Sequence, residues 1–323
     1  MFRACWGFAA WLAIVGLPPA AHGQWTVEKT PAGATVKFGG KLVAEYITRS
    51  GTKPILWPLI GPTQKPVTRA YPMDEKVPGE AHDHLHQRSC WFTYGDVNGI
   101  DFWAEPKTAA VGTRVGTIEH KDFVELAGGP DKAVVETTND WLGPDGSQQC
   151  SDRRRFEFRM AGDQRIIDCD ITLTAPDRPV VFGDTKEGAF GLRVAQEMAL
   201  TSNAGGEIVN SHGDKNGDAW GKPAEWVDYH GPVDPNDDAV VGIAILNHPA
   251  SFHYPTRWHV RDYGLFAANP FGRKEFPGGG EGGHTLPPRG ELKLYYRMIL
   301  HKDDEQAAGI AKAYERYAKE QRP

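Results

Sequence analysis

The sequence predicts an all-β protein: a large antiparallel β-sandwich of the supersandwich type that ends in one amphipathic helix. Glycine (37) and proline (24) are plentiful and scattered, which is typical of many short strands joined by turns. Apolar residues alternate with polar ones in many stretches, and a helical period is confined to the last segment. Neither a repeat of 20–50 residues nor a linker-like stretch interrupts this pattern, so residues 24–323 are predicted to form a single domain.

The predicted strands follow from period-2 alternation. The stretch ATVKFGGKLVAEYIT predicts two strands that turn at residues 39–40, and RRRFEFRMAGDQRIIDCDITLTA predicts a hairpin that turns at residues 161–163. In the second strand of this hairpin, Ile167, Cys169 and Ile171 share one face. VVGIAILNHP is almost entirely apolar, which indicates a strand covered on both faces, and ELKLYYRMILH predicts another strand late in the chain.

The helix is predicted over residues 303–321. Acidic residues at the start of this segment suit a helix N-terminus, and Ile310, Tyr314 and Tyr317 are spaced i, i+4 and i+7. We therefore expect one apolar face of this helix to pack on the β-rich body.

Residues 1–23 have the pattern of a signal peptide. Arg3 precedes an apolar run that two prolines interrupt, and Ala21 and Gly23 fit the −3 and −1 positions of a cleavage before Gln24. We expect a periplasmic or secreted protein, with a retained membrane anchor as the alternative. No later stretch reaches the roughly 18 apolar residues of a membrane helix, so no membrane insertion is expected after cleavage.

The charge and the cysteines narrow the function classes. A net charge of −6 argues against nucleic acid or an anionic membrane as the partner. Cys90, Cys150 and Cys169 follow the signal peptide without the spacing of a disulfide framework or a cysteine zinc site. One bridge between Cys150 and Cys169 stays open, because an exported protein meets an oxidising compartment. The sequence leaves the oligomeric state undetermined.

The first stretch that carries chemistry is AHDHLHQRSCW, residues 81–91. If residues 82–88 are extended, His82, His84, His86 and Arg88 project to one side. Two imidazoles so placed, His84 and His86, could hold a divalent metal ion, and the alternative is a hydrogen-bonded polar strand. The stretches GDVNGID and HGDKNGDAW resemble calcium loops, but they lack the closing glutamate of an EF-hand and are predicted to be turns.

Two further stretches combine charged and aromatic side chains. In GDTKEGAFGLRV, Phe190, Leu192 and Val194 alternate as a core face, and Glu187 and Arg193 share the opposite face. A carboxylate beside a cation could act as an acid, a base or a ligand, and a surface turn is the alternative. In HGDKNGDAWGKPAEWVDYHG the dense aromatic residues, among them Trp220, suit either sugar rings or a core.

The richest stretch is LNHPASFHYPTRWHVRDYGLFAANPFG, residues 246–272. Along RWHVRDYGL the odd positions predict one strand face that presents His259, Arg261 and Tyr263, with Trp258 and Val260 on the buried face. Imidazole, guanidinium and phenol together suit a hydroxyl-rich or anionic ligand, and a salt-bridged outer face is the alternative. His248 precedes a proline at a predicted strand end, where functional side chains often lie.

Taken together, these stretches resemble an exported bacterial family of unknown function, the PmoA-like ("methane oxygenase PmoA") family. The motifs that carry the resemblance occur in order across residues 55–300: DHLHQRSCWFTYGDVNGIDFW, GDTKEGAFGLRV, AWGKPAEWVDY and NHPASFHYPTRWHVRDYGLFAANPFG. The chain departs from the family pattern at Gln87, Ser251 and His253, which are therefore not carried as candidates. The resemblance implies a sugar-processing context, and the strand layout is more weakly similar to the galactose-mutarotase-like superfamily.

The sequence thus predicts an exported protein that binds a sugar in a groove and acts on it by acid–base chemistry, as an epimerase, lyase or hydrolase. One histidine would be the acid, and Glu187 or a second histidine the base. The expected partner is a small-molecule or oligosaccharide substrate, with no cofactor or one divalent ion at His84 and His86. The alternatives are a metal-dependent enzyme and a non-catalytic carbohydrate-binding protein. The predicted catalytic residues are His84, His86, Glu187, His248 and His259, and the predicted substrate-binding residues are Arg88, Arg193, Arg261, Tyr263 and Trp220.

Overall fold

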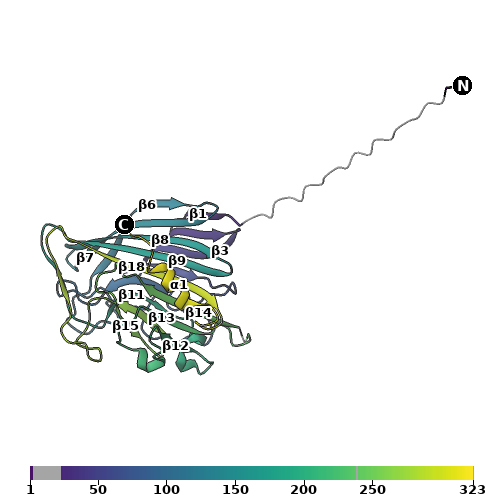
Figure 1. Ribbon diagram of the computed structural model, residues 1–323. Coiled ribbons are helices and arrows are strands. Elements are labelled where there is room, and N and C mark those ends of the chain that lie inside the picture. The colour runs from purple at the N-terminus through teal and green to yellow at the C-terminus, as the bar shows by residue number, and fades with distance from the viewer. Residues whose placement is uncertain (3–22, 238, 323) are drawn as a thin grey trace.

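Two eight-stranded antiparallel sheets face each other in the computed structural model (Figure 1). The structure describes residues 1–2, 23–237 and 239–322, so most of the predicted signal peptide lies outside the described residues. The all-β sandwich with one C-terminal helix is confirmed.

The first sheet has the strand order β1-β2-β3-β4-β5-β11-β16-β15. Its strands are β1 (Trp25–Lys29), β2 (Gly33–Phe38), β3 (Lys41–Ser50), β4 (Lys53–Leu59), β5 (Cys90–Tyr94), β11 (Gly188–Arg193), β16 (Leu265–Asn269) and β15 (Arg257–Val260). The second sheet has the order β12-β13-β14-β18-β9-β8-β7-β6. Its strands are β12 (Glu207–Asn210), β13 (Trp226–Pro232), β14 (Val240–Asn247), β18 (Glu291–Lys302), β9 (Gln164–Thr174), β8 (Gln148–Ala161), β7 (Lys132–Leu142) and β6 (Thr117–Ala127).

Smaller elements complete the chain. Strands β10 (Val180–Phe182) and β17 (His284–Leu286) form a two-stranded sheet. Three short 3-10 helices lie between β11 and β13: η1 (Gln196–Met198), η2 (Leu200–Ser202) and η3 (Asn216–Ala219). The helix α1 spans Ile310–Tyr317 and packs on the outer face of the second sheet, over β14 and β18 (Figure 1).

The main core lies between the two sheets. Phe190 of β11 stacks on Tyr296 of β18 with 5.1 Å between ring centroids, and Phe92 of β5 meets Trp141 of β7 at 5.8 Å. Both contacts bridge the sheets, and all four side chains are buried. Because strand side chains alternate, the residues between these core positions point to the outer faces of the sandwich.

The strands predicted from apolar alternation are present. The turn at residues 39–40 joins β2 and β3, with φ of 56° and 78° at two glycines that tolerate this left-handed conformation. The predicted hairpin joins β8 to β9, and Ile167, Cys169 and Ile171 are buried together. Residues 98–99 form a tight Asn-Gly turn, as predicted. Cys150 and Cys169 are free, because the register pairs Cys169 with Phe156.

The helix predicted over residues 303–321 is shorter than expected. Residues 305–309 form turns, and α1 begins only at Ile310, because Gly309 adopts a left-handed φ of 69°. The predicted apolar positions Ile310 and Tyr317 are buried against the second sheet, and Tyr314 is partly buried beside them. The acidic residues at the start of the segment therefore cap a turn and not the helix itself.

The strand predicted over residues 82–88 is wrong. The segment, which we call the histidine loop, is irregular, with a left-handed φ of 41° at His84. Leu85 is the one apolar residue of the segment, so no row of apolar side chains exists for a sheet to bury. Two buried arginines hold it instead. Arg69 donates to the carbonyl oxygens of Asp83 (3.0 Å) and His84 (3.2 Å), and Arg193 donates to the Asp83 carboxylate (2.9 Å) and to Gln87 Oε1 (2.5 Å).

The single strand predicted over residues 257–265 is instead a hairpin. Strand β15 ends at Val260, residues 261–264 form the turn, and β16 begins at Leu265. Trp258 and Val260 are buried in the core as predicted, and His259 points to the outer face. Arg261 and Tyr263 therefore extend from a turn at the end of β15, where Gly264 supplies a left-handed φ of 100°.

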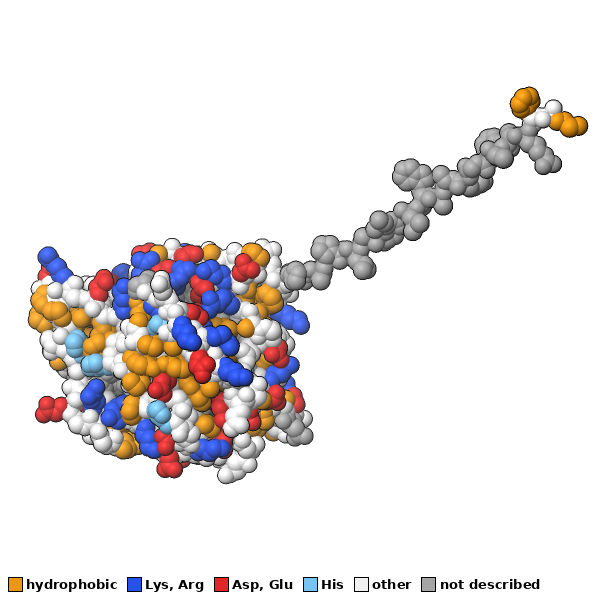
Figure 2. Space-filling model, in the orientation of Figure 1, with side chains coloured by type: hydrophobic (Ala, Val, Ile, Leu, Met, Phe, Trp, Pro, Cys, Tyr) orange, Lys and Arg blue, Asp and Glu red, His pale blue; other side chains and the backbone are white. Residues whose placement is uncertain are grey.

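The surface carries charges of both signs. On the face shown in Figure 2, Lys and Arg side chains are interspersed with Asp and Glu around a hydrophobic patch. Within the described residues, the structure has no helix of the length and hydropathy needed to cross a membrane.

The anchoring of the histidine loop predicts the effect of Asp83→Asn. This change removes the carboxylate that Arg69 and Arg193 share, whereas the size of the side chain is kept. Breaking a fully buried ion pair costs roughly 3–5 kcal/mol, and because Asp83 is 39% exposed we expect a loss of about 2 kcal/mol in the free energy of unfolding. Urea denaturation measures it, and hydrogen exchange should become faster in residues 81–87.

Asp177→Asn is the matched control, because its ion pair with Arg289 is about 80% exposed on both sides. A solvated pair of this kind contributes roughly 0–1 kcal/mol. Equal losses in the two variants would contradict the anchoring role of Asp83.

Candidate functional site

A cavity of about 500 Å³ lies on the outer side of the first sheet. Three separate segments bring predicted site residues into it: the histidine loop, the residues before β11, and the β15–β16 hairpin. The predicted residues that line it are His84, His86, Glu187, His259, Arg261 and Tyr263. Residues that the sequence analysis did not select complete the lining: Gln87, Asp101, Trp103, Ala104, Thr108, Ala109, Ala110, Thr113 and Lys186.

An apolar cluster on the outer face of the first sheet supports the cavity. Trp91 and Ala267 belong to this cluster, and Trp103 packs edge-on against Trp91 at 5.3 Å. Cross-strand pairing sets His259 beside Ala267, Ala267 beside Gly191, and Gly191 beside Trp91. Ala267 and Gly191 in the middle of this row are small, and the large side chains of His259 and Trp91 stand at its two ends. Trp103 and Tyr263 contact the cluster and also line the cavity.

His259 has the geometry of a base. Its Nδ1 lies 2.9 Å from the backbone carbonyl oxygen of Lys186, and because a carbonyl oxygen only accepts, Nδ1 carries the proton. Nε2 is then the free acceptor, and it has no hydrogen-bond partner in the described part of the chain. Burial lowers the pKa of His259 to about 4, so the ring is neutral at physiological pH.

Glu187 supplies the carboxyl group of the cavity. It directly precedes β11, and burial raises its pKa although the neighbouring Lys186 opposes this shift. Lys186 Nζ lies 3.5 Å from Glu187 Oε1 and 2.6 Å from Glu275 Oε2. Because the shorter of these pairs engages the ammonium with Glu275, Glu187 keeps only a loose partner and can hold a proton above the usual range.

The two histidines of the loop form one wall. His84 stacks on Tyr263 with 4.8 Å between ring centroids, and its Nδ1 lies 2.8 Å from Asp83 Oδ2. His86 lies beside Trp103, at 6.1 Å between centroids. Burial and the charge of Lys53 lower the pKa of His86 to about 3, so this ring is also neutral.

Cationic and aromatic groups continue the lining next to His84. The Arg261 guanidinium lies 5.4 Å from the ring centroid of Trp220 and 5.9 Å from that of Tyr263. Burial raises the pKa of the Tyr263 phenol, which therefore stays a hydrogen-bond donor at neutral pH. Arg261 and Lys186 place two positive charges at the cavity.

Four predicted residues lie outside this lining. Arg193 lies beneath it, 4.7 Å from the Tyr263 ring centroid, and Trp220 lines an adjoining hollow that shares Arg261. Arg88 binds Glu105 (2.8 Å) and lines a different cavity. His248 is far from the group. It packs on the Tyr317 ring of α1 at 4.9 Å, because the end of β14 belongs to the second sheet.

The donor set of a metal site is not assembled in this cavity. Within residues 23–237 and 239–322, neither His84 nor His86 belongs to a group of three His, Cys, Asp or Glu side chains whose ligand atoms lie within 4.8 Å of one another. The geometry therefore does not support the alternative of a metal-dependent enzyme at His84 and His86.

Sequence reasoning missed Trp103, Lys186 and Asp101 as cavity residues. Asp101 Oδ1 accepts hydrogen bonds from the backbone N–H groups of Trp103 (2.7 Å) and Ala104 (2.9 Å), so it positions the indole. Its stretch has the pattern of a calcium loop or a turn, and neither pattern predicts a place in a cavity. No local pattern distinguishes a tryptophan of this kind from a core tryptophan, because its partners come from the distant histidine loop.

Several solved structures are distantly similar to this chain. An α-galactosidase from Lactobacillus brevis is 12% identical, with a TM-score of 0.42, over 93% of this chain and 43% of its own. The Slr1438 protein from Synechocystis sp. PCC 6803 is 11% identical, with a TM-score of 0.34, over 91% of this chain and 100% of its own. A glycoside hydrolase family 97 enzyme from Pseudoalteromonas sp. strain K8, in complex with panose, is 11% identical, with a TM-score of 0.31, over 87% of this chain and 34% of its own.

The chain thus spans less than half the length of the galactosidase and of the family 97 enzyme. No curated protein sequence matches it. A sequence model of a family of unknown function, DUF6807, matches residues 33–315, and the chain therefore belongs to this family.

Proposed function

We propose that the cavity binds a carbohydrate and catalyses an acid–base reaction on it. The observation that carries this proposal is the convergence of a neutral buried histidine, a carboxyl group with a raised pKa and two cations in one cavity lined by aromatic rings. A volume of about 500 Å³ suits a small ligand. The Trp103 ring suits the C–H groups of a sugar, and the polar side chains match its hydroxyl groups.

The pKa shifts assign the proton roles. His259 is neutral with a free Nε2, so it acts as the base. Glu187 holds its proton above the usual range of a carboxyl group, so it acts as the acid. This assignment reverses the roles expected from the sequence, where a histidine was the acid. Arg261 and Lys186 are placed to stabilise an oxyanion or to bind a substrate carboxylate.

The cellular context of this proposal rests on the sequence. Export to the periplasm or the exterior, the signal peptide, the single-domain organisation and the PmoA-like and mutarotase-like resemblances stay predictions. The cavity and its contacts lie within the described residues and do not depend on these predictions.

The proposal predicts that His259→Gln and Glu187→Gln each reduce turnover. General acid or base groups contribute about 10²–10⁴-fold, and we expect losses of this size with sugar affinity changed only a few-fold. A panel of mono- and oligosaccharides, followed by tryptophan fluorescence for binding and by NMR for products, identifies the substrate and measures both quantities.

The matched controls are His212→Gln and Glu315→Gln, since both side chains are exposed and lie outside the cavity. Unchanged turnover in the His259 and Glu187 variants would overturn the assigned roles. Saturable sugar binding without any product would favour the non-catalytic alternative.

The same assignment predicts a bell-shaped pH profile. Turnover should rise as the pH passes about 4, where His259 loses its proton and becomes a base. It should fall again as the pH passes the raised pKa of Glu187, where the acid is lost. Initial rates across the pH range measure the profile, and Glu187→Gln should remove its alkaline limb. An alkaline limb that persists in Glu187→Gln would contradict the proposed roles.

A further inference from the structure

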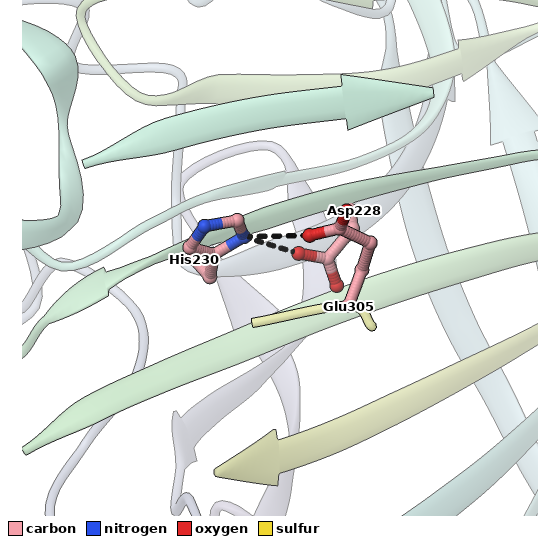
Figure 3. Close-up of side chains that lie close together, drawn as sticks. All are labelled: Asp228, His230 and Glu305. Carbon is pink, nitrogen blue, oxygen red and sulfur yellow. Dashed lines mark hydrogen bonds and ion pairs between the residues drawn. The ribbon is translucent and has the colours of Figure 1, made fainter. Parts of the chain in front are cut away.

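A second cluster of chemically active side chains lies away from the cavity, on the outer face of the second sheet. Asp228 and His230 lie two positions apart on β13 and therefore point to the same side. Glu305 reaches them from the turns between β18 and α1 (Figure 3). One ligand atom from each side chain lies within 4.8 Å of the other two. No other described group of three or more His, Cys, Asp and Glu side chains meets this condition.

The three ligand atoms of this cluster lie close enough to converge on one ion once the hydrogen bond between His230 and Asp228 opens. His230 Nδ1 lies 2.7 Å from Asp228 Oδ1 and 3.8 Å from Glu305 Oε2 (Figure 3). Metal–ligand bonds of about 2.0–2.2 Å in a tetrahedral site put neighbouring ligand atoms about 3.4 Å apart. The two measured separations lie on either side of this value, so small side-chain movements would bring all three atoms to one ion.

The surroundings of the Glu305 carboxylate indicate a cation-binding position. Its side chain is only 10% exposed, and its carboxylate accepts no hydrogen bond within the described residues. Its one ion-pair contact is the 3.8 Å approach to His230, which is too long for a hydrogen bond. A largely covered carboxylate that no donor of the described residues reaches is a favourable place for a cation, and a divalent cation would supply the partner that this one lacks.

The surroundings of Asp228 resemble the outer support of a metal ligand. His301 of β18 lies with Nε2 2.6 Å from the second carboxylate oxygen, Asp228 Oδ2. The register places Gly242 of β14 between His230 and His301, and a Cβ at Gly242 would collide with the His301 ring. The glycine therefore gives the imidazole the room to cross β14 and orient the carboxylate, as partners of ligating carboxylates commonly do.

We propose that this cluster binds one divalent transition-metal ion through His230 Nδ1, Asp228 Oδ1 and Glu305 Oε2. A mixed set of one imidazole and two carboxylates suits Zn²⁺, and the two carboxylates balance its charge. His230 and Glu305 are each 10% exposed, which leaves a further coordination position open to water. The ion fastens the turns before α1 to the second sheet, so its role is structural and independent of the sugar cavity.

Zinc titration of the metal-stripped protein tests this site. Calorimetry should show one equivalent of Zn²⁺ bound, and zinc at 100 times the dissociation constant should raise the Tm by about 5 °C. Glu305→Gln keeps the size of the side chain but removes a charged ligand, and it should weaken zinc binding at least 10-fold and abolish most of the shift. Glu315→Gln on the exposed side of α1 is the matched control and should behave as the unsubstituted protein.

Zinc affinity that is unchanged by Glu305→Gln would overturn the proposal, as would the absence of saturable zinc binding. The latter result would leave the cluster as a proton-linked network in which the two histidines share Asp228. A second measurement needs no variant. Zn²⁺ should slow amide hydrogen exchange in residues 303–309 and β13 of the unsubstituted protein, and slowing confined to other segments would refute the site.

Discussion

The candidate site depends on one interaction, the Asp83 carboxylate shared by the buried guanidinium groups of Arg69 and Arg193. Two like charges in one buried place repel each other, and burial together with Arg193 lowers the pKa of Arg69 to about 10. Although burial alone would raise it, the pKa of Asp83 falls to about 2 under the influence of Arg193, His84 and Arg69. The carboxylate offsets the repulsion between the two cations. The two guanidinium groups in turn hold the irregular histidine loop against the first sheet.

The sandwich explains why this loop forms a wall of a cavity. Each strand of the first sheet sends alternate side chains to the core, and the others are left for the outer face. On β15, Trp258 enters the core and His259 emerges beside Ala267. The buried Trp258 side chain holds β15 in place, and this also fixes the backbone position of the neighbouring His259. The functional groups on the outer face rest on the apolar cluster of that face, and the covering segment that they also need is the anchored loop.

The sequence predicted those strands whose positions are marked by a row of apolar residues. Strands β8, β9, β14 and β18 each bury a row of apolar residues, and their positions follow from that row. The alternation of His84 and His86 is accompanied by a single apolar residue, Leu85, and not by a row of them, so the same period did not mark a strand. The cluster of Asp228, His230 and Glu305 went unseen for another reason. Its carboxylates come from segments that are distant in the sequence, and the pattern around residue 228 predicts only a cluster of aromatic residues.

Two groups of histidines in this protein show that surroundings, and not spacing, decide the chemistry of an imidazole. In the cavity, burial and nearby cations lower the pKa values of His86 and His259, and both rings are neutral acceptors. On the second sheet, burial acts in the same direction on His230 and His301, yet the buried Asp228 raises both pKa values. A histidine among cations is available as a base, whereas a histidine held by carboxylates belongs to a site that already attracts positive charge. His84 lies beside the Asp83 carboxylate, but within the described residues no further ligand joins it, and the proposed cation site lies on the opposite sheet.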